Sequence, residues 1–150
     1  MFHILVVDDD KNTRQLIKAV LETENYIVIG ATDGEDALKV LDRSHIDLVI
    51  LDVMMPKMDG YEFTEILRRV QNELPILMVS AKQLPADRNK GFIVGTDDFM
   101  TKPFDEEELL LRVKALLRRA KIVNEHRIII GEVILDYDSL TVKRKNTCQE

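Results

Sequence analysis

Five short apolar runs recur along the chain, and none of them alternates apolar with polar residues. Such runs are typical of parallel strands that are covered on both faces of a sheet. The pattern therefore predicts five strands, at Ile4 to Val7, Ile27 to Ile29, Leu48 to Leu51, Ile76 to Val79 and Asp98 to Met100.

Between these runs, apolar residues recur at the spacing of amphipathic helices. A weaker pattern over Ala86 to Val94 predicts the fourth helix of the series. Asp33 and Asp105 stand where helix caps are expected, and Gly60 and Gly95 mark turns. The residues that mark the first, second, third and fifth helices are Leu16, Ile17, Val20 and Leu21; Ala37, Leu38 and Leu41; Tyr61, Ile66 and Leu67; and Leu109, Leu110, Val113, Leu116 and Leu117.

Strands that alternate with helices and are joined by short loops indicate an α/β fold. Because crossovers between neighbouring parallel strands are right-handed, the helices are expected on both faces of one sheet. We therefore predict a doubly wound, five-stranded parallel sheet of the (βα)₅ type over about residues 3 to 120.

The pattern changes after Arg119, where helical periodicity gives way to a polar, basic stretch. Residues 121–127 are expected to form a linker, and apolar runs within 128–150 predict short strands separated by turns. Three short strands without a helix cannot bury a two-sided core. The predicted organisation is one domain over residues 1–120, the linker, and a short C-terminal β segment that opens a second, unfinished domain.

The composition is that of a globular protein, with 45% hydrophobic and 32% charged residues in a chain of 150. No segment approaches the roughly 20 apolar residues of a membrane span, and no basic leader precedes the first strand. The single Cys148 has no internal disulfide partner, which favours a reducing, cytoplasmic location. A net charge of −6 argues against direct binding of nucleic acid by these residues.

Acidic residues follow the first and third predicted strands. Asp8 and Asp9 come directly after the first strand, and Asp52 ends the third. Open α/β folds place their sites at the carboxyl edge of the sheet, so these carboxylates are expected to converge. Mg²⁺ prefers such oxygen ligands, and the backbone carbonyl of Met54 is a further candidate. An ordinary role as a turn or cap residue is the alternative for each aspartate taken alone.

Asp52 is the best candidate for a phosphoryl acceptor, because an apolar turn without other nucleophiles follows it. A carboxylate that attacks a phosphoryl donor forms an acyl phosphate, and catalysis then rests mainly on positioning and on cations. Lys102 suits the role of the cation, since Pro103 favours an extended conformation before it. A cis bond between these two residues is compatible with the sequence but does not follow from it.

Two further residues are candidates for a switch. Ser80 ends the fourth strand, where its hydroxyl is placed to donate to a phosphoryl oxygen. Phe99 lies on a short strand, where an aromatic side chain that moves between buried and exposed positions would form a two-state element. A helix cap or turn for Ser80, and core packing for Phe99, are the alternatives.

Five motifs in this order resemble the receiver domain of bacterial two-component response regulators, which has a flavodoxin-like fold. The resemblance covers about residues 2 to 120. Phe99 stands where the family commonly has tyrosine, and Thr96 where it usually has alanine. The motifs are Val6-Val7-Asp8-Asp9-Asp10; Leu51-Asp52-Val53-Met54-Met55-Pro56 with Met58-Asp59-Gly60; Val79-Ser80-Ala81; Gly95-Thr96-Asp97-Asp98-Phe99; and Thr101-Lys102-Pro103-Phe104.

The resemblance implies a role for each of these residues. A sensor histidine kinase would phosphorylate Asp52, and Asp8, Asp9, Asp52 and the Met54 carbonyl would hold Mg²⁺. Ser80, Lys102 and Phe99 match the switch serine or threonine, the lysine and the switch aromatic of the family.

The sequence also resembles the OmpR/PhoB subfamily of transcription factors. The resemblance implies a homodimer formed on phosphorylation through the fourth helix, fifth strand and fifth helix, with charged pairs across it. Residues 128–150 look like the first strands of that subfamily's winged-helix domain. The resemblance implies that the recognition helix should lie beyond Glu150, so that only a longer parent would bind promoter DNA. The charged residues implied for the dimer are Arg88, Asp97, Asp98, Glu108, Arg112 and Arg119.

Three functions are therefore compared. The first is a phosphorylated receiver that controls transcription by dimerising, and that is not an enzyme toward outside substrates. The second is a magnesium-dependent phosphohydrolase with Asp52 as nucleophile, against which stands Met54 where such enzymes often have a second carboxylate. The third is a stand-alone receiver that acts by protein contact, for which residues 128–150 are a tail.

Overall fold

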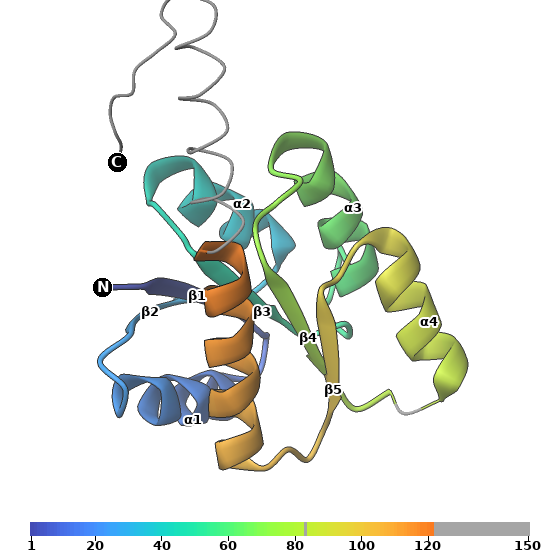
Figure 1. The fold of residues 1–150 in the computed structure, drawn as a ribbon. Helices are drawn as coiled ribbons and strands as arrows, with labels where there is room; N and C mark the ends of the chain where they lie inside the picture. The colour runs from blue at the N-terminus through green and yellow to red at the C-terminus, as the bar shows by residue number, and fades with distance from the viewer. Residues whose placement is uncertain (83, 122–150) are drawn as a thin grey trace, which may run out of the picture. The chain divides into compact units, whose positions relative to one another are not determined.

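The computed structural model describes residues 1–82 and 84–121. Strands and helices alternate along these residues (Figure 1), and a further helix covers residues 106–121. The labelled elements are β1 (His3–Val7), α1 (Lys11–Glu22), β2 (Ile27–Ala31), α2 (Gly34–Arg43), β3 (Leu48–Leu51), α3 (Gly60–Val70), β4 (Ile76–Ser80), α4 (Pro85–Val94) and β5 (Asp98–Thr101).

The five strands form one parallel sheet in the order β2-β1-β3-β4-β5. This order confirms the predicted doubly wound α/β fold. The chain moves outward from β1 to β2 and then crosses to β3 on the other side of β1. The loops after β1 and β3 therefore leave the sheet in opposite directions, which opens a site at the carboxyl edge between them.

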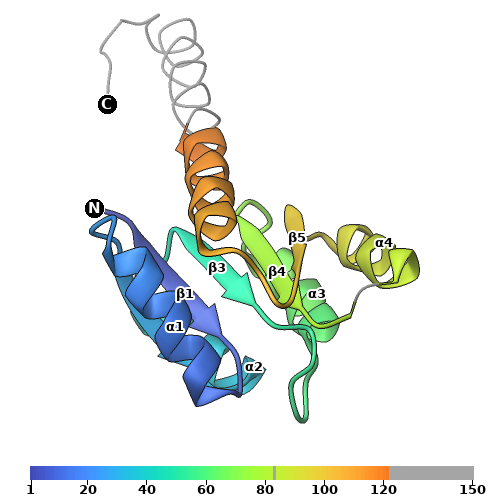
Figure 2. The same ribbon diagram turned by 90° about the horizontal axis from the view of Figure 1, so that it is seen from below.

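Each face of the sheet has its own apolar core, because successive side chains of a strand point to opposite faces. Val6 and Ile50 pack with α1 and with the buried residues of the last helix, such as Leu109. Leu5 and Leu51 pack on the other face with residues of α2 and α3. Figure 2 shows α1 and the last helix in a different layer from α2, α3 and α4. Burial on both faces explains why the strands read as unbroken apolar runs.

Two helices are capped at their amino-terminal ends by the aspartates that the sequence predicted. The Asp33 side chain accepts a hydrogen bond of 2.8 Å from the backbone N–H of Asp36, and the Asp105 side chain accepts one of 3.1 Å from Glu108. Both predicted caps are confirmed. They satisfy backbone donors that the first turn of a helix leaves unpaired.

Contacts divide the chain into two units, Met1–Leu117 and Arg118–Glu150. Of the second unit the structure describes only residues 118–121, which are helical. Lys121, the first residue of the predicted linker, is therefore still part of a helix. The rest of that linker and the predicted β segment over 128–150 lie outside the described residues.

Candidate functional site

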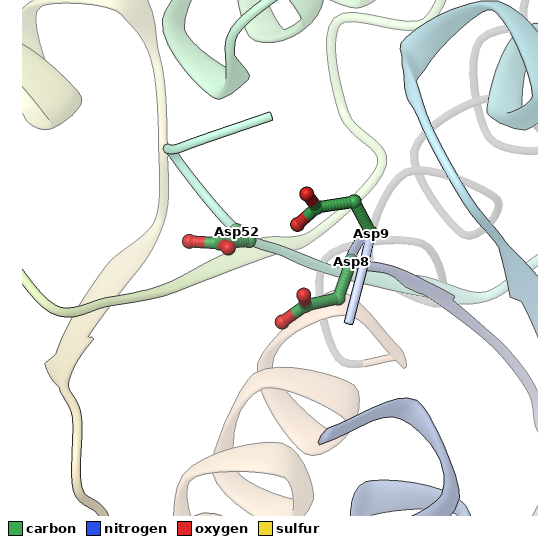
Figure 3. A group of neighbouring side chains, drawn as sticks. All are labelled: Asp8, Asp9 and Asp52. Atoms are coloured by element: carbon green, nitrogen blue, oxygen red, sulfur yellow. The ribbon is translucent and has the colours of Figure 1, made fainter. Parts of the chain in front are cut away.

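Three carboxylates meet at the carboxyl edge of the sheet. Asp8, Asp9 and Asp52 each present one oxygen within 4.8 Å of those of the other two, and Figure 3 shows the three side chains gathered at two strand ends. Asp8 is 2% exposed and Asp52 is 7% exposed, whereas Asp9 is exposed. The structure thus brings together the three acids that the sequence predicted.

The register of the sheet explains this convergence. Val7 of β1 pairs with Leu51 of β3, so the next residue of each strand, Asp8 and Asp52, leaves the sheet at the same level. The backbone N–H of Asp52 donates to the carbonyl of Val7 at 2.9 Å. The acids are therefore held by ladder hydrogen bonds of the central strands rather than by a loose loop.

The first turn of α3 packs closely against the backbone of the loop that follows Asp52. The backbone N–H of Gly60 donates to the carbonyl of Val53 at 2.8 Å. A Cβ at position 60 would lie 2.6 Å from the Asp52 carbonyl oxygen and 2.8 Å from Cα of Val53, so only glycine permits this approach. Asp59 caps the same helix through a capping box with Glu62.

Lys102 follows β5 and reaches across the edge of the sheet to the acids. Its Nζ donates to Asp8 Oδ2 at 2.9 Å and to Asp52 Oδ2 at 3.4 Å. Its backbone N–H donates to the carbonyl of Ser80 at 2.8 Å, which fixes the residue beside β4. The bond between Lys102 and Pro103 is cis, the isomer that the sequence left open.

The site combines two buried acids, Asp8 and Asp52, with one partly buried cation, Lys102. Burial raises the pKa of the Asp52 carboxyl, the charge of Lys102 lowers it, and the charge of Asp8 raises it again, so the net shift is upward. Burial alone would lower the pKa of Lys102, but its hydrogen bond to Asp8 and the charge of Asp52 raise it overall. Lys102 therefore keeps its proton near neutral pH, and the buried Asp52 carboxylate gains from any further cation.

Ser80 and Met54 lie next to this cluster. Ser80 is fully buried at the end of β4, and its Oγ accepts a hydrogen bond of 3.2 Å from the backbone N–H of Lys82. The backbone N–H of Met54 donates to Asp52 Oδ1 at 3.2 Å, while the Met54 side chain is 57% exposed. This contact fixes the Asp52 carboxylate. The role of the Met54 carbonyl as a metal ligand stays a prediction.

A cavity of about 490 Å³ opens beside the acids. A space of this size admits a hydrated cation and a small phosphoryl donor. Exposed Asp9 and Met54 contribute to its wall, so a ligand would enter from solvent on that side. Its lining residues are Asp9, Val53, Met54, Met55, Pro56, Asp59, Tyr61, Lys82 and Lys90.

Phe99 is 2% exposed and packs against α4. A Cβ at Gly91 would lie 3.2 Å from the Phe99 ring, so the helix approaches the strand closely at this point. The Arg88 guanidinium lies 5.8 Å from the centre of the same ring. Phe99 is therefore in the buried position of the predicted switch.

Four of the six charged residues predicted for a dimer form ion pairs within the chain. Arg112 donates to both carboxylate oxygens of Asp98 at 2.8 Å and to Glu108 at 3.0 Å. Asp97 instead contacts Arg68 of α3 at 2.8 Å. Arg119 is exposed. The single chain does not test pairs between two chains, which stay a prediction.

Two arginines make contacts that the sequence did not predict. Arg14 of α1 donates to the carbonyl of Asp8 at 2.6 Å, and Arg68 donates to the carbonyl of Gly95 at 2.9 Å. Arg14 follows the Asp10 cap by one helical turn, which is the only signal in the sequence that places it near the site. Arg14 thus holds the loop after β1 at the carboxyl edge of the sheet, whereas Arg68 holds the segment before β5 at the opposite edge.

Among residues 1–82 and 84–121, no helix is long and apolar enough to cross a membrane.

The sequence model of the family described as "Response regulator receiver domain" matches residues 4–114. The chain is similar to "Heme response regulator HssR" of Staphylococcus epidermidis, with 38% identity over 147 residues, 97% of this chain and 65% of that protein. It is also similar to "Alkaline phosphatase synthesis transcriptional regulatory protein PhoP" of Bacillus subtilis, with 44% identity over 140 residues, 87% of this chain and 58% of that protein. The chain thus spans less than two thirds of the length of these relatives.

Solved structures share the fold. The receiver domain of the Francisella response regulator 1452 has a TM-score of 0.76 and 35% identity, over 79% of this chain and 98% of that one. The chemotaxis protein CheY4 of Vibrio cholerae has a TM-score of 0.74 and 34% identity, over 77% of this chain and 98% of that one.

Proposed function

Because the chain belongs to the family of response regulator receiver domains, we propose that Asp52 accepts a phosphoryl group from a sensor histidine kinase in a reaction that requires Mg²⁺. Membership of this family makes the chain a signalling protein rather than an enzyme, so the phosphohydrolase alternative is set aside. The observation that supports the proposal is the placement of the buried Asp52 carboxylate between two further acids and the Lys102 ammonium.

The proposed reaction assigns one task to each residue. An oxygen of the Asp52 carboxylate attacks phosphorus while the bond from phosphorus to the donor's histidine nitrogen breaks, which leaves an acyl phosphate and a neutral imidazole once that nitrogen has taken a proton. Lys102, held 2.9 Å from Asp8, would pair with the phosphoryl oxygens. The Ser80 hydroxyl lies on the same edge and would donate to one of them.

A divalent cation suits the three acids. Asp8, Asp9 and Asp52 supply hard oxygen ligands, with the Met54 carbonyl as the predicted fourth. When bound, Mg²⁺ would neutralise charge on the transferring phosphoryl group. The chain itself fixes Asp8 and Asp52 through the sheet and leaves Asp9 on the solvent side.

The proposal is tested by treating the chain with acetyl phosphate, with and without Mg²⁺, and by locating the product by mass spectrometry. We expect one phosphoryl group per chain, on Asp52, only when Mg²⁺ is present. Labelling elsewhere, or labelling that does not depend on a divalent cation, would contradict the assignment.

Removal of one acid should abolish the effect of Mg²⁺ on stability. Mg²⁺ at about 100 times its Kd should raise the free energy of unfolding by about 2.7 kcal/mol, because it binds the folded chain only. In Asp9→Asn this rise should be lost, and the exposed side chain can change without disturbing the core. Thermal denaturation with MgCl₂, against KCl at equal ionic strength, gives the comparison. An equal rise in the variant would exclude Asp9 as a ligand.

We further propose that phosphorylation moves Ser80 and Phe99 and so changes the face formed by α4, β5 and the helix over 106–117. That face would then pair with a second copy of the chain through Arg88, Asp97, Asp98, Glu108, Arg112 and Arg119. The position of the Phe99 ring next to Gly91 of α4 supports this coupling, since the ring and the helix lie side by side.

Charge reversal in this face should weaken the phosphorylated dimer. Arg112→Glu would set a carboxylate against the acidic residues proposed for the same face of the second copy, and like charges across an interface repel. We expect dimerisation to weaken by roughly tenfold, about 1.4 kcal/mol, while Asp52 is still phosphorylated. Sedimentation of the phosphorylated chains measures this, with Arg69→Glu on α3 as the control for net charge. Equal dimerisation of the two variants would remove Arg112 from the interface.

Control of transcription is the proposed output. A relative bears the name of a transcriptional regulatory protein, and this chain spans 58% of its length. We propose that a longer parent binds promoter DNA through a winged-helix domain that begins within residues 128–150, and that it works in the cytoplasm. DNA binding by the parent, compared with residues 1–120 alone, separates this function from that of a stand-alone receiver.

A further inference from the structure

Two of the chain's three histidines lie beside one aspartate at the amino-terminal edge of the sheet. His3 begins β1, while His45 and Asp47 stand between α2 and β3. The strands β1 and β3 are parallel, and their opposite ends carry Asp8 and Asp52. This cluster is therefore separate from the phosphorylation site by the length of the strands.

Asp47 is fixed by the backbone. Its Oδ2 accepts a hydrogen bond of 2.8 Å from the backbone N–H of His3, and its own N–H donates to the His3 carbonyl at 2.8 Å. Its side chain is only 23% exposed. The carboxylate is thus held in one place before any ligand arrives, and its two oxygens have lone pairs to spare.

The ring of His3 carries an unpaired atom. Its Nδ1 is buried and is the only buried side-chain nitrogen or oxygen of the described residues that has no hydrogen-bond partner. It lies 3.9 Å from Asp47 Oδ2, too far for a hydrogen bond. Buried polar atoms are normally paired, and an exception often marks an unseen water or ion.

The ring of His45 lies on the other oxygen of the same carboxylate. Its Nε2 is 2.9 Å from Asp47 Oδ1, and its side chain is 80% exposed. The two rings have their centres 6.4 Å apart. Two imidazole nitrogens thus flank one anchored carboxylate. The three side chains do not yet bring one ligand atom each within 4.8 Å of one another, so a shared ion requires the exposed His45 ring to rotate.

We propose that His3, His45 and Asp47 form a binding site for a transition-metal cation such as Zn²⁺ or Ni²⁺. Two imidazoles and a carboxylate are a ligand set for these ions, with water completing the coordination. The set is unsuited to Mg²⁺, which prefers oxygen ligands. A turn held only by hydrogen bonds is the competing explanation. It accounts for His45 but leaves Nδ1 of His3 without a partner.

Such a site would connect the first strand to the segment before the third, across 44 residues of sequence. A metal that binds only the folded chain would raise the unfolding temperature. Because the two sites are at opposite edges, metal at the histidines should leave phosphorylation of Asp52 unchanged.

Titration with Zn²⁺ in the presence of excess Mg²⁺ tests the site, read by calorimetry and by thermal denaturation. The Asp9→Asn chain is used throughout, so that the acidic cluster is disabled. We expect one equivalent of Zn²⁺ to bind and to raise the midpoint temperature of thermal unfolding. His45→Gln should weaken binding by at least about tenfold and remove the rise, and His3→Gln should do the same. His126→Gln, which changes the third histidine, is the matched control and should bind as before.

A second readout separates a metal ligand from a structural residue. Co²⁺ bound by two imidazoles and a carboxylate should give a visible absorption band, and His45→Gln should lose it while keeping its midpoint in EDTA. Because His45 is exposed, this variant carries the test even if His3→Gln folds poorly. Undiminished Zn²⁺ binding by His45→Gln, or loss of binding in His126→Gln, would overturn the proposal.

Discussion

Asp52→Asn is expected to abolish phosphorylation by acetyl phosphate and Mg²⁺ without loss of stability. An amide of the same shape has no carboxylate oxygen to attack phosphorus. Its oxygen can still accept the hydrogen bond of 3.2 Å from the backbone N–H of Met54. Lys102 keeps its shorter contact with Asp8, at 2.9 Å. The packing of the site therefore survives the change, and only its chemistry is removed.

The direction of the change in stability caused by Asp52→Asn can also be predicted. Burial raises the pKa of Asp52 in the folded chain, so the fold disfavours the charged carboxylate at neutral pH. A neutral amide avoids that cost and the repulsion from Asp8. In the absence of divalent cations, Asp52→Asn should therefore unfold at the same temperature as the unaltered chain or at a higher one, and the gap should narrow toward acid pH as Asp52 takes up a proton.

Asp10→Asn is the matched control for labelling. Asp10 lies beside the cluster, is exposed, and caps α1 by accepting from the N–H of Asn12 at 3.0 Å. Asparagine caps a helix about as well as aspartate, so the fold should not change. This variant should be phosphorylated on Asp52 to the same extent as the unaltered chain. Undiminished labelling of Asp52→Asn would instead place the acceptor on another residue.

The fold and the acids were predictable because both depend on short patterns. Apolar runs such as Leu48 to Leu51 contain no polar residue, and this lack of alternation predicts a strand that is buried on both faces. Parallel strands then place Asp8 and Asp52 at one edge. Lys102 could be named as a candidate, but its contact with two carboxylates depends on the neighbouring position of β5 and β4, which only the sheet order supplies.

Other features depend on contacts between distant residues, which no local pattern records. Arg68 donates to the carbonyls of Leu74 and Gly95 and pairs with Asp97, but as a sequence it is one of two adjacent arginines at the end of a helix. Gly60 reads as a turn residue. Its close approach to the backbone of Asp52 appears only when α3 is packed against the β3 loop.

Gly60→Ala is expected to lower both stability and the rate of phosphorylation. The added Cβ would lie 2.6 Å from the Asp52 carbonyl oxygen and 2.8 Å from Cα of Val53, and backbone atoms cannot turn aside as a flexible side chain can. The first turn of α3 and the Asp52 loop must therefore separate. Overpacking of this kind costs about 1 to 3 kcal/mol, and urea denaturation measures it as a lower midpoint at unchanged slope.

Gly30→Ala on β2 is the control for replacing glycine. A Cβ there meets only the Arg14 side chain, at 3.6 and 3.8 Å, which is ordinary contact. Alanine in a strand is more stable than glycine by roughly 0.5 to 1 kcal/mol. The free energy of unfolding should therefore rise slightly in Gly30→Ala, whereas it should fall in Gly60→Ala. Phosphorylation is compared well below both midpoints, so that all chains are folded. A slower rate confined to Gly60→Ala would show that the loop position, not stability alone, sets the reactivity of Asp52. Equal rates and equal midpoints would mean that α3 can move away from the loop without cost.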